Sequence, residues 1–300
     1  INRCLVGSEM CIRDRNNLCY SIDQNYEGIH FPKSLPPEFI ATRSVLRSFS
    51  DISAMGARPL WFSVALACDF DEKFINDFSK GLNKVSNLLS VPLIGGDLIK
   101  TSQKSVTVSV SGETKKNNHL SRSGAKHNQN IYLTGELGLA RKGLEEITKN
   151  FNNNIYRKKN VKRFIFPKLR LEISNSISQY ASSCIDVSDG FIADLEKILI
   201  PSNQGAVIYL DDIPRVDKSS LQDFIFGDDL ELIFTADKKY HKKIIKLSVN
   251  SGIKINLIGH TKRNDEIKYF LNNEEVQFPR KRGWNHGCLL YTSPSPRDTG

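Results

Sequence analysis

A polar stretch over residues 114–130 constrains the fold of this 300-residue chain most, because it separates two series of strand and helix patterns. Few large apolar side chains occur in it, and the apolar periodicity restarts beyond it. Each series is long enough to bury a core of its own. The pattern predicts an α+β protein with two α/β domains, the first over residues 16–125 and the second over 126–287.

Apolar spacing predicts the elements of each series. In the first, helices are expected over 38–55 and 72–89, and strands over 18–23, 60–68, 91–94 and 105–112. In the second, helices are expected over 138–148, 169–180, 190–200 and 238–249, and strands over 131–135, 206–210, 230–236, 255–259 and 267–271. A loop is expected over 183–189, between two of these helices.

Composition excludes several classes of protein. The longest apolar run, residues 60–68, is far shorter than the roughly 20 residues of a membrane-spanning helix. Six cysteines without a C-x-x-C pair indicate neither a disulfide framework nor a structural zinc site, which favours a cytoplasmic protein. The net charge of +9 comes from scattered Lys and Arg clusters, so we expect solvated faces rather than a nucleic-acid interface.

The two ends of the chain lack the apolar periodicity found in the rest of the sequence. Residues 1–15 and 288–300 have no helix or strand period and resemble translated adapter sequence, so we expect both to be non-native tails. Natural disordered tails are the alternative. The ordered protein is therefore expected over about residues 16–287.

Aspartates at predicted strand ends and loop-to-helix junctions carry the clearest chemical signal. They are Asp23, Asp97, Asp186 and Asp189, while Asp51 lies inside a predicted helix. Carboxylates beside hydroxyl groups, without His or Cys, are a ligand set that suits Mg²⁺. The alternative for each is a helix cap or a turn residue. No G-x-x-x-x-G-K-[ST] phosphate loop occurs in the chain.

Eight short segments, in order and at matching spacing, resemble one family. They are Ser21-Ile22-Asp23, His30-Phe31, 50–57, Ile94-Gly95-Gly96-Asp97, 121–126, 185–190, 227–232 and Gly283-Trp284-Asn285-His286. Together they resemble the bacterial thiamine-monophosphate kinases, whose superfamily includes aminoimidazole ribonucleotide synthetase and selenide water dikinase. The resemblance covers about residues 18–286.

The resemblance implies transfer of the γ-phosphate of ATP to thiamine monophosphate, giving thiamine diphosphate, with Mg²⁺ as cofactor. It implies metal ligands at Ser21, Asp23, Asp51, Asp97, Asp186 and Asp189. It implies ATP contacts at Gly96, Asp97, Arg122 and Ser188, and thiamine monophosphate contacts at His30, Asp228 and Trp284. It also implies a homodimer joined through the N-terminal sheets, and no residue acting as an acid or base. Positioning and charge neutralisation would then supply most of the rate.

The chain departs from the family pattern at three places. A Gly-x-Gly-Asp-Asp motif that family members carry upstream of residue 21 is absent, Ile22 replaces threonine, and Gly227-Asp228-Asp229-Leu230 replaces Gly-Glu-Asp-Tyr. Two other readings therefore stay open. One is an inactive fragment that only binds nucleotide or thiamine phosphate, and the other is a related enzyme acting on another small phosphorylated metabolite.

Three of the predicted ligand contacts have structural alternatives. These are a surface histidine for His30, a place at the edge of a core for Trp284, and a helix cap or a partner of Glu for Arg122.

Overall fold

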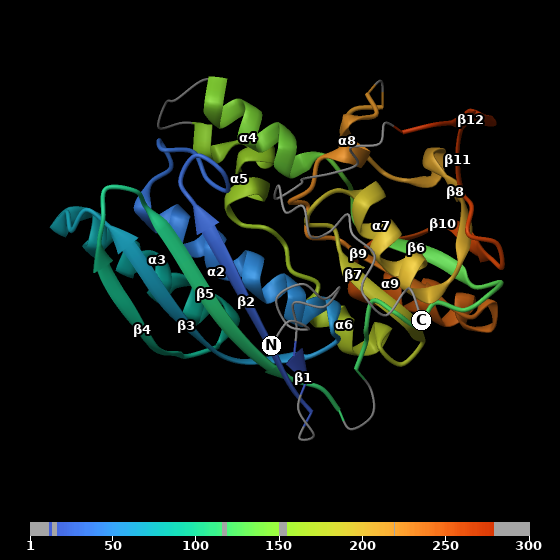
Figure 1. The fold of residues 1–300 in the computed structure, drawn as a ribbon, viewed down its shortest axis with the longest axis horizontal. Helices are drawn as coiled ribbons and strands as arrows, with labels where there is room; N and C mark the ends of the chain where they lie inside the picture. The colour runs from blue at the N-terminus through green and yellow to red at the C-terminus, as the bar shows by residue number, and fades with distance from the viewer. Residues whose placement is uncertain (1–11, 14–16, 116–118, 150–154, 219, 279–300) are drawn as a thin grey trace, which may run out of the picture.

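The computed structural model describes residues 12–13, 17–115, 119–149, 155–218 and 220–278, which form two β-sheets with helices packed on them (Figure 1). This arrangement confirms the α+β class. The tails expected at 1–15 and 288–300 lie outside the described residues, except for positions 12–13, and so does Trp284. Among the described residues, no helix combines the length and the apolar character needed to cross a bilayer.

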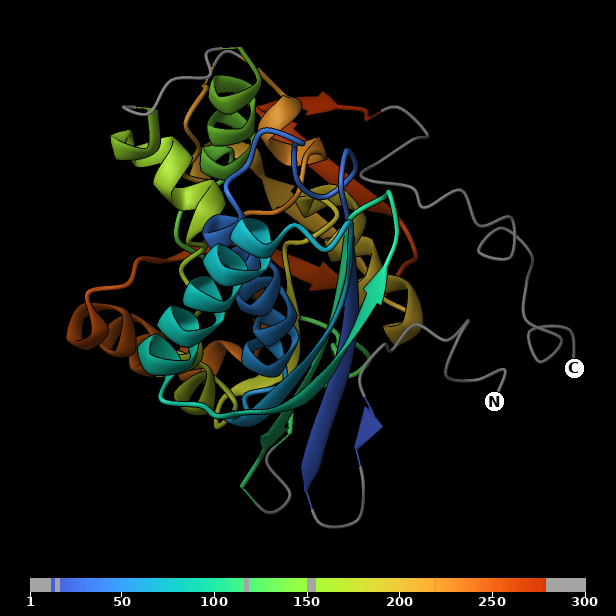
Figure 2. The ribbon, with the colours of Figure 1, turned by 90° about the vertical axis from the view of Figure 1, so that its left-hand side faces the viewer.

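The first sheet has five strands in the order β1-β2-β5-β3-β4. Their bounds are β1 Ile12–Arg13, β2 Leu18–Tyr26, β3 Arg58–Cys68, β4 Leu93–Lys100 and β5 Ser105–Glu113. Two helices, α2 (Pro37–Ala54) and α3 (Glu72–Leu89), cover one face of the sheet (Figure 2). The helical spacing predicted both of these helices, and the structure confirms them.

The strand predicted over 91–94 differs from the one observed. We expected it to end before Gly95-Gly96-Asp97, but β4 continues through all three residues and pairs in parallel with β3 as far as Lys100. Gly96 permits this close pairing, because a Cβ atom there would lie 2.1 Å from the Val64 carbonyl oxygen. Backbone pairing with β3 therefore overrides the turn tendency of the two glycines.

The second sheet has seven strands in the order β12-β11-β8-β10-β6-β9-β7. Their bounds are β6 Asn130–Thr134, β7 Ala181–Asp186, β8 Gly205–Tyr209, β9 Leu232–Ala236, β10 Ile255–Lys262, β11 Ile267–Leu271 and β12 Glu274–Val276. The helices of this half of the chain are α4 Leu139–Lys149, α5 Lys159–Ile165, α6 Leu171–Ile177, α7 Phe191–Leu199, α8 Gln222–Ile225 and α9 His241–Ser251.

The prediction of a loop over 183–189 is wrong for residues 183–186. Residues 183–186 belong to β7, which pairs antiparallel with β9 and ends at Asp186. The run Ser182-Ser183-Cys184-Ile185 has no alternation of apolar and polar residues, so its local pattern gave no strand signal. Helices α5 and α8 and strand β12 were also not expected from the local pattern.

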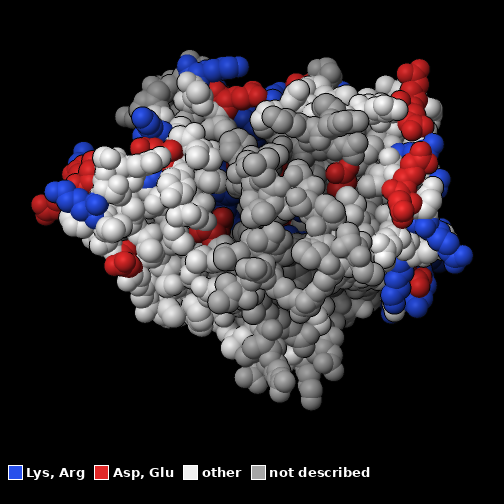
Figure 3. Space-filling view, in the orientation of Figure 1, with Lys and Arg blue, Asp and Glu red and all other residues white. Residues whose placement is uncertain are grey.

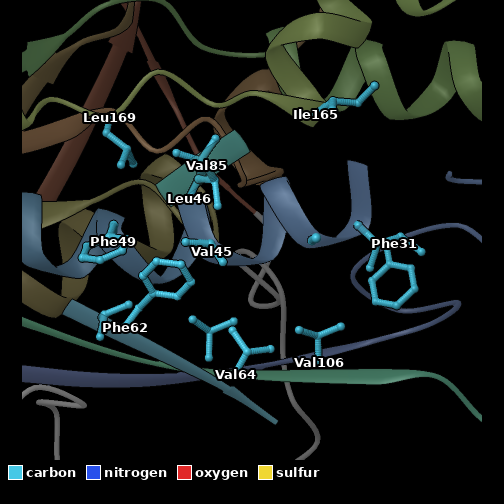
Figure 4. Packing of buried hydrophobic residues seen from close by; sticks show 14 of the residues in the cluster. Phe31, Val45, Leu46, Phe49, Phe62, Val64, Val85, Val106, Ile165 and Leu169 are labelled. Carbon is cyan, nitrogen blue, oxygen red and sulfur yellow. The ribbon is translucent and has the colours of Figure 1, made fainter. Parts of the chain in front are cut away.

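The core of the first half extends into the second series of elements. Buried residues of α2, β3 and β5 pack with residues that follow β6, among them Ile147 and Phe164. Ile165 and Leu169 belong to the same cluster (Figure 4). Helices α4 and α5 thus close the far side of this core. Helix α2 lies between the first sheet and the second half of the chain, and 13 of its 18 residues are buried. Its polar side chains therefore face protein rather than water.

Candidate functional site

Two carboxylates from opposite halves of the chain meet beside helix α2. Asp51 lies in the last turns of α2, and Asp186 is the last residue of β7. Ser21 on β2 donates a hydrogen bond of 2.5 Å to Asp51 Oδ2, and Ser50 donates one of 2.6 Å to Asp186 Oδ2. Both carboxylates line one pocket together with Arg122. The structure thus brings together four of the residues singled out in the sequence, Ser21, Asp51, Arg122 and Asp186, and a serine hydroxyl orients each carboxylate.

The pKa values of Asp51 and Asp186 show that ionising both carboxylates is unfavourable. Burial, together with the neighbouring Asp51 carboxylate, raises the pKa of Asp186 to about 6, although Ser50 and Arg122 act against this shift. Burial also raises the pKa of Asp51, with Asp23 adding to the shift. Two buried carboxylates that repel each other favour a nearby cation. The pair is therefore a site for a metal ion or for another positive charge.

Arg47 of α2 lies within electrostatic reach of several of the site's aspartates. Burial lowers its pKa, but the carboxylates of Asp228, Asp23, Asp189 and Asp186 outweigh burial and raise it. Three of the predicted metal ligands therefore lie within electrostatic reach of one guanidinium group. The sequence analysis did not identify this arginine.

The loop after β7 is held by an aspartate in the first turn of α7. Asp194 Oδ2 accepts hydrogen bonds from the backbone N–H groups of Ser188, Asp189 and Gly190, at 2.9, 2.9 and 3.1 Å. Lys197 bridges the carboxylates of Asp189 and Asp194. Asp189 thus faces a lysine in this structure, and its loop has a fixed backbone.

Asp228 is bound by two arginines of α2. Arg43 Nη2 lies 2.7 Å from Oδ2, and Arg47 Nε lies 3.1 Å from Oδ1. Burial would raise the pKa of Asp228, but Arg43 and Arg47, with His30, outweigh burial and lower it. The backbone N–H of Asp228 donates to the Ser188 carbonyl at 3.0 Å. Asp228 therefore contacts the Ser188 backbone and lies within electrostatic reach of His30.

Asp97 does not join this group within one chain. In the register of the sheet, Asp97 on β4 pairs with Ala65 on β3, Ala65 pairs with Thr107 on β5, and Thr107 pairs with Gln24 on β2. Three strand spacings, roughly 14 Å in total, therefore separate Asp97 from β2. Residues in register share a face, so Asp97 and Gln24 lie on the opposite face of the sheet from Asp23. The strand order therefore separates Asp97 from the other metal ligands predicted from the sequence.

Ser21 and Gly96 also have structural roles. Ser21 is fully buried, and its hydroxyl hydrogen is committed to Asp51. Gly96 allows the close contact of β4 with β3, as described above. Both residues support the sheet that carries Asp23 and Asp97.

Behind the site lies a buried ionic network that the sequence analysis also missed. Glu231 is bound by Arg163 and Arg170, each at 2.5 Å. Asp229 accepts hydrogen bonds from the N–H groups of Gly138 and Ala140, at 2.7 and 3.1 Å, and so caps the start of α4. Burial raises the pKa of Asp229 to about 7 despite these bonds. This network joins the segment before β9 to α4, α5 and the start of α6.

A helical pattern could have found the missed arginines. Arg43, Arg47 and Asp51 recur every four residues and so share one face of α2. Asp194 had a signal too, because an acid in the first turn after a glycine is a common helix start. No local pattern indicates that Arg43 and Asp228, 185 residues apart, form an ion pair.

The donors present fit Mg²⁺ only when substrate oxygens complete the shell. Among the described residues, no group of three or more His, Cys, Asp or Glu side chains forms a ready ligand set. Magnesium is usually held by one or two carboxylates, with phosphate oxygens and water as its other ligands. Asp51 and Asp186 supply such a pair of carboxylates, and neither hydroxyl bond occupies all of their oxygen lone pairs.

Comparison with known proteins supports one family. The family model described as AIR synthase related protein, N-terminal domain, matches residues 7–114. Thiamine-monophosphate kinase of Buchnera aphidicola from Schizaphis graminum is 33% identical over 290 residues, which span 92% of this chain and 88% of that protein. Thiamine-monophosphate kinase of Escherichia coli K12 is 29% identical over 287 residues, with the same coverage of 92% and 88%.

Solved structures agree with this fold. Thiamine-monophosphate kinase from Stenotrophomonas maltophilia K279a superposes with a TM-score of 0.77 at 25% identity, covering 88% of this chain and 89% of that one. A structure described as AaThiL complexed with AMPPCP and TMP gives a TM-score of 0.79 at 22% identity, covering 94% and 92%. With 33% identity to a relative over most of both chains, the protein belongs to the thiamine-monophosphate kinase family.

Proposed function

We propose that this chain phosphorylates thiamine monophosphate to thiamine diphosphate, with ATP as donor and Mg²⁺ as cofactor. One observation carries the proposal. Asp51 and Asp186, from opposite halves of the chain, line one pocket with Arg122, and each is oriented by a serine hydroxyl. Such a convergence of fixed carboxylates and a guanidinium group suits charge neutralisation between two phosphates.

The reaction needs little proton chemistry. An oxygen of the acceptor phosphate attacks the γ-phosphorus, the bond from γ-phosphorus to the β,γ-bridging oxygen breaks, and ADP leaves with that oxygen's electron pair. A phosphate monoester has its second pKa near 6, so the attacking oxygen is already ionised at neutral pH. No side chain has to take a proton, which agrees with the lack of a base in the assigned set.

A Mg²⁺ ion at this site would supply positive charge against the phosphates. Asp51 and Asp186 would hold it, with Asp23 and Asp189 adjoining them. Neighbouring cationic side chains balance only part of the charge of these acids. Arg122 lowers the pKa of both Asp51 and Asp186, and Lys197 lies against Asp189.

The two substrates would approach from different sides of the cluster. Arg122, beside Asp51 and Asp186, suits the polyphosphate of ATP. The fixed backbone of Ser188 lies in the loop that directly follows Asp186. His30 lies near Asp228, on the side away from Arg122 along α2, and suits the acceptor. His30 Nδ1 accepts the Tyr26 N–H at 3.0 Å, which fixes the orientation of the imidazole ring.

The first sheet also supports the proposed homodimer. Every residue of the edge strand β4 is exposed. Its large apolar side chains are Leu93, Ile94, Leu98 and Ile99, which are 42%, 59%, 44% and 61% exposed. The described part of the sheet's outer face is nearly free of charged side chains (Figure 3). An uncovered apolar edge strand is unfavourable in a monomer, and a second copy would cover it.

Dimerisation would give Asp97 a role that one chain cannot. Since it lies apart from Asp23 on the other face of the sheet, we propose that it serves the carboxylate cluster of a second copy. The Gly95-Gly96-Asp97 segment on β4 would then lie at the interface. This proposal keeps Asp97 in the site and accounts for an acid on a face that carries few other charged side chains.

Turnover tests the proposed function directly. The chain is incubated with ATP, Mg²⁺ and thiamine monophosphate, and thiamine diphosphate is measured by chromatography. We expect product with the unaltered chain, and at least about 100-fold less with Asp186→Asn, since a fixed electrostatic group of this kind supplies a factor of that size. Thiamine without its phosphate should give no product. Equal rates for both chains would contradict the assigned roles, and no product from the unaltered chain would favour a protein that only binds its ligands.

A further inference from the structure

Arg47 is the least explained charge near the site. It lies one helical turn before Asp51 on the face of α2 that meets the second half of the chain. Its side chain is only 13% exposed. Nη1 donates to Asn25 Oδ1 at 2.8 Å, and Nε lies 3.1 Å from Asp228 Oδ1. A hidden guanidinium with two polar contacts on different edges has a fixed orientation.

The residue that orients Arg47 is itself tightly fixed. Asp228 binds Arg43 through its other oxygen, and its backbone N–H donates to the Ser188 carbonyl. Arg43 in turn donates to the Phe164 carbonyl at 2.5 Å, and its guanidinium lies 3.7 Å from the centre of the Phe164 ring. Elements from both halves of the chain therefore determine where Arg47 points.

The charge count leaves Arg47 partly uncompensated. Two guanidinium groups, those of Arg43 and Arg47, share the one carboxylate of Asp228. The other acids that face Arg47 are Asp23, Asp186 and Asp189, the residues proposed to serve the metal. Once a cation binds these three carboxylates, Arg47 is left with Asp228, whose carboxylate it shares with Arg43. An anionic ligand would then supply the missing negative charge.

We infer that Arg47 binds the phosphate group of thiamine monophosphate and holds it beside the carboxylate cluster. The inference rests on the proposed function. Arg47 lies one turn of α2 before Asp51, pairs with Asp228 and is within electrostatic reach of Asp186, so a phosphate beside the carboxylate cluster would lie close to it. A planar guanidinium matches two oxygens of a phosphate, which fixes the attacking oxygen as well as its charge.

Binding measurements separate this role from turnover. Isothermal titration calorimetry in Mg²⁺ measures the affinity of each variant for thiamine monophosphate, thiamine and the ATP analogue AMPPCP. We expect Arg47→Gln to weaken thiamine monophosphate by about 10- to 100-fold, the loss typical of one charge-assisted hydrogen bond. Affinities for thiamine and AMPPCP should change less than about threefold. Arg47→Lys, which keeps the charge but not the planar fork, should lie between.

The control is Arg58→Gln, because Arg58 is an exposed arginine whose partner is Glu113. It should leave all three affinities unchanged. Titrations are run below the melting temperature of every variant, so that loss of folding does not imitate loss of binding. The inference is overturned if Arg47→Gln binds thiamine monophosphate normally, if it loses thiamine equally, or if AMPPCP is the ligand that weakens. A failure of the unaltered chain to make product counts against the proposed function instead.

Discussion

Ser50 on α2 donates a hydrogen bond to Asp186 at the end of β7, with 2.6 Å between Oγ and Oδ2. Both residues are buried, and 136 positions separate them in the chain. The bond orients a carboxylate of one half by a hydroxyl of the other. Small shifts between the halves would therefore change the site before they changed either core.

Replacing Ser50 by alanine should move the acid limb of the pH profile. The Ser50 hydroxyl lowers the pKa of Asp186, which burial has raised to about 6. Without it the pKa rises further, so more alkaline conditions are needed to ionise the carboxylate. We expect the acidic midpoint of kcat/KM to shift upward in Ser50→Ala. A profile that keeps the original midpoint would mean that Asp186 does not limit activity at low pH.

Two inactive variants should restore activity when mixed, if Asp97 serves the cluster of a second copy. Asp97→Asn and Asp51→Asn chains are unfolded together and refolded at equal amounts. About one quarter of the sites should then be intact, since half of the dimers are mixed and each mixed dimer has one complete site. Mixing without unfolding is the control. Absence of recovery, in chains that light scattering shows to be dimers, would place Asp97 outside the active site.

Asp194→Ala should destabilise the loop after β7. Three backbone N–H groups lose their acceptor, and Lys197 loses one of its two partners. We expect the free energy of unfolding to fall by about 3 kcal/mol and turnover to fall with it. Asp194→Asn retains one oxygen acceptor and should recover part of the stability. Urea unfolding gives the measurement, and an alanine variant as stable as the parent would mean that water replaces these bonds without cost.

Asp229 should make the protein less stable as the pH rises. Its folded pKa is about 7, above the ordinary value of 3.8, so the folded state keeps a proton that the unfolded chain releases. The free energy of unfolding therefore falls between about pH 4 and 7, and this contribution is constant above that range. Asp229→Asn cannot titrate, so its stability should fall less steeply over the same range. Urea midpoints measured from pH 4.5 to 8 provide the comparison, and parallel curves would refute the assignment.

Local patterns in the sequence determined the elements and most of the site's chemistry. Apolar spacing predicted α2 and α3 closely, because one buried face of a helix leaves a 3.6-residue period wherever the helix packs. Asp186 stood out as an acid beside hydroxyl groups at a predicted loop-to-helix junction, and Asp51 was singled out with it as a carboxylate that suits Mg²⁺. Where the local pattern was weak, as in β7, the prediction failed.

Tertiary structure alone decided which of the predicted residues meet. The strand order placed β4 three positions from β2, so Asp97 lies apart from Asp23 although both were predicted at strand ends. The pairing of Arg43 and Arg47 with Asp228 also has no sequence signature, because a buried charge requires a partner somewhere in the fold but not at any fixed distance along the chain. Periodicity is a local property, whereas charge compensation and strand order depend on residues far apart in the sequence.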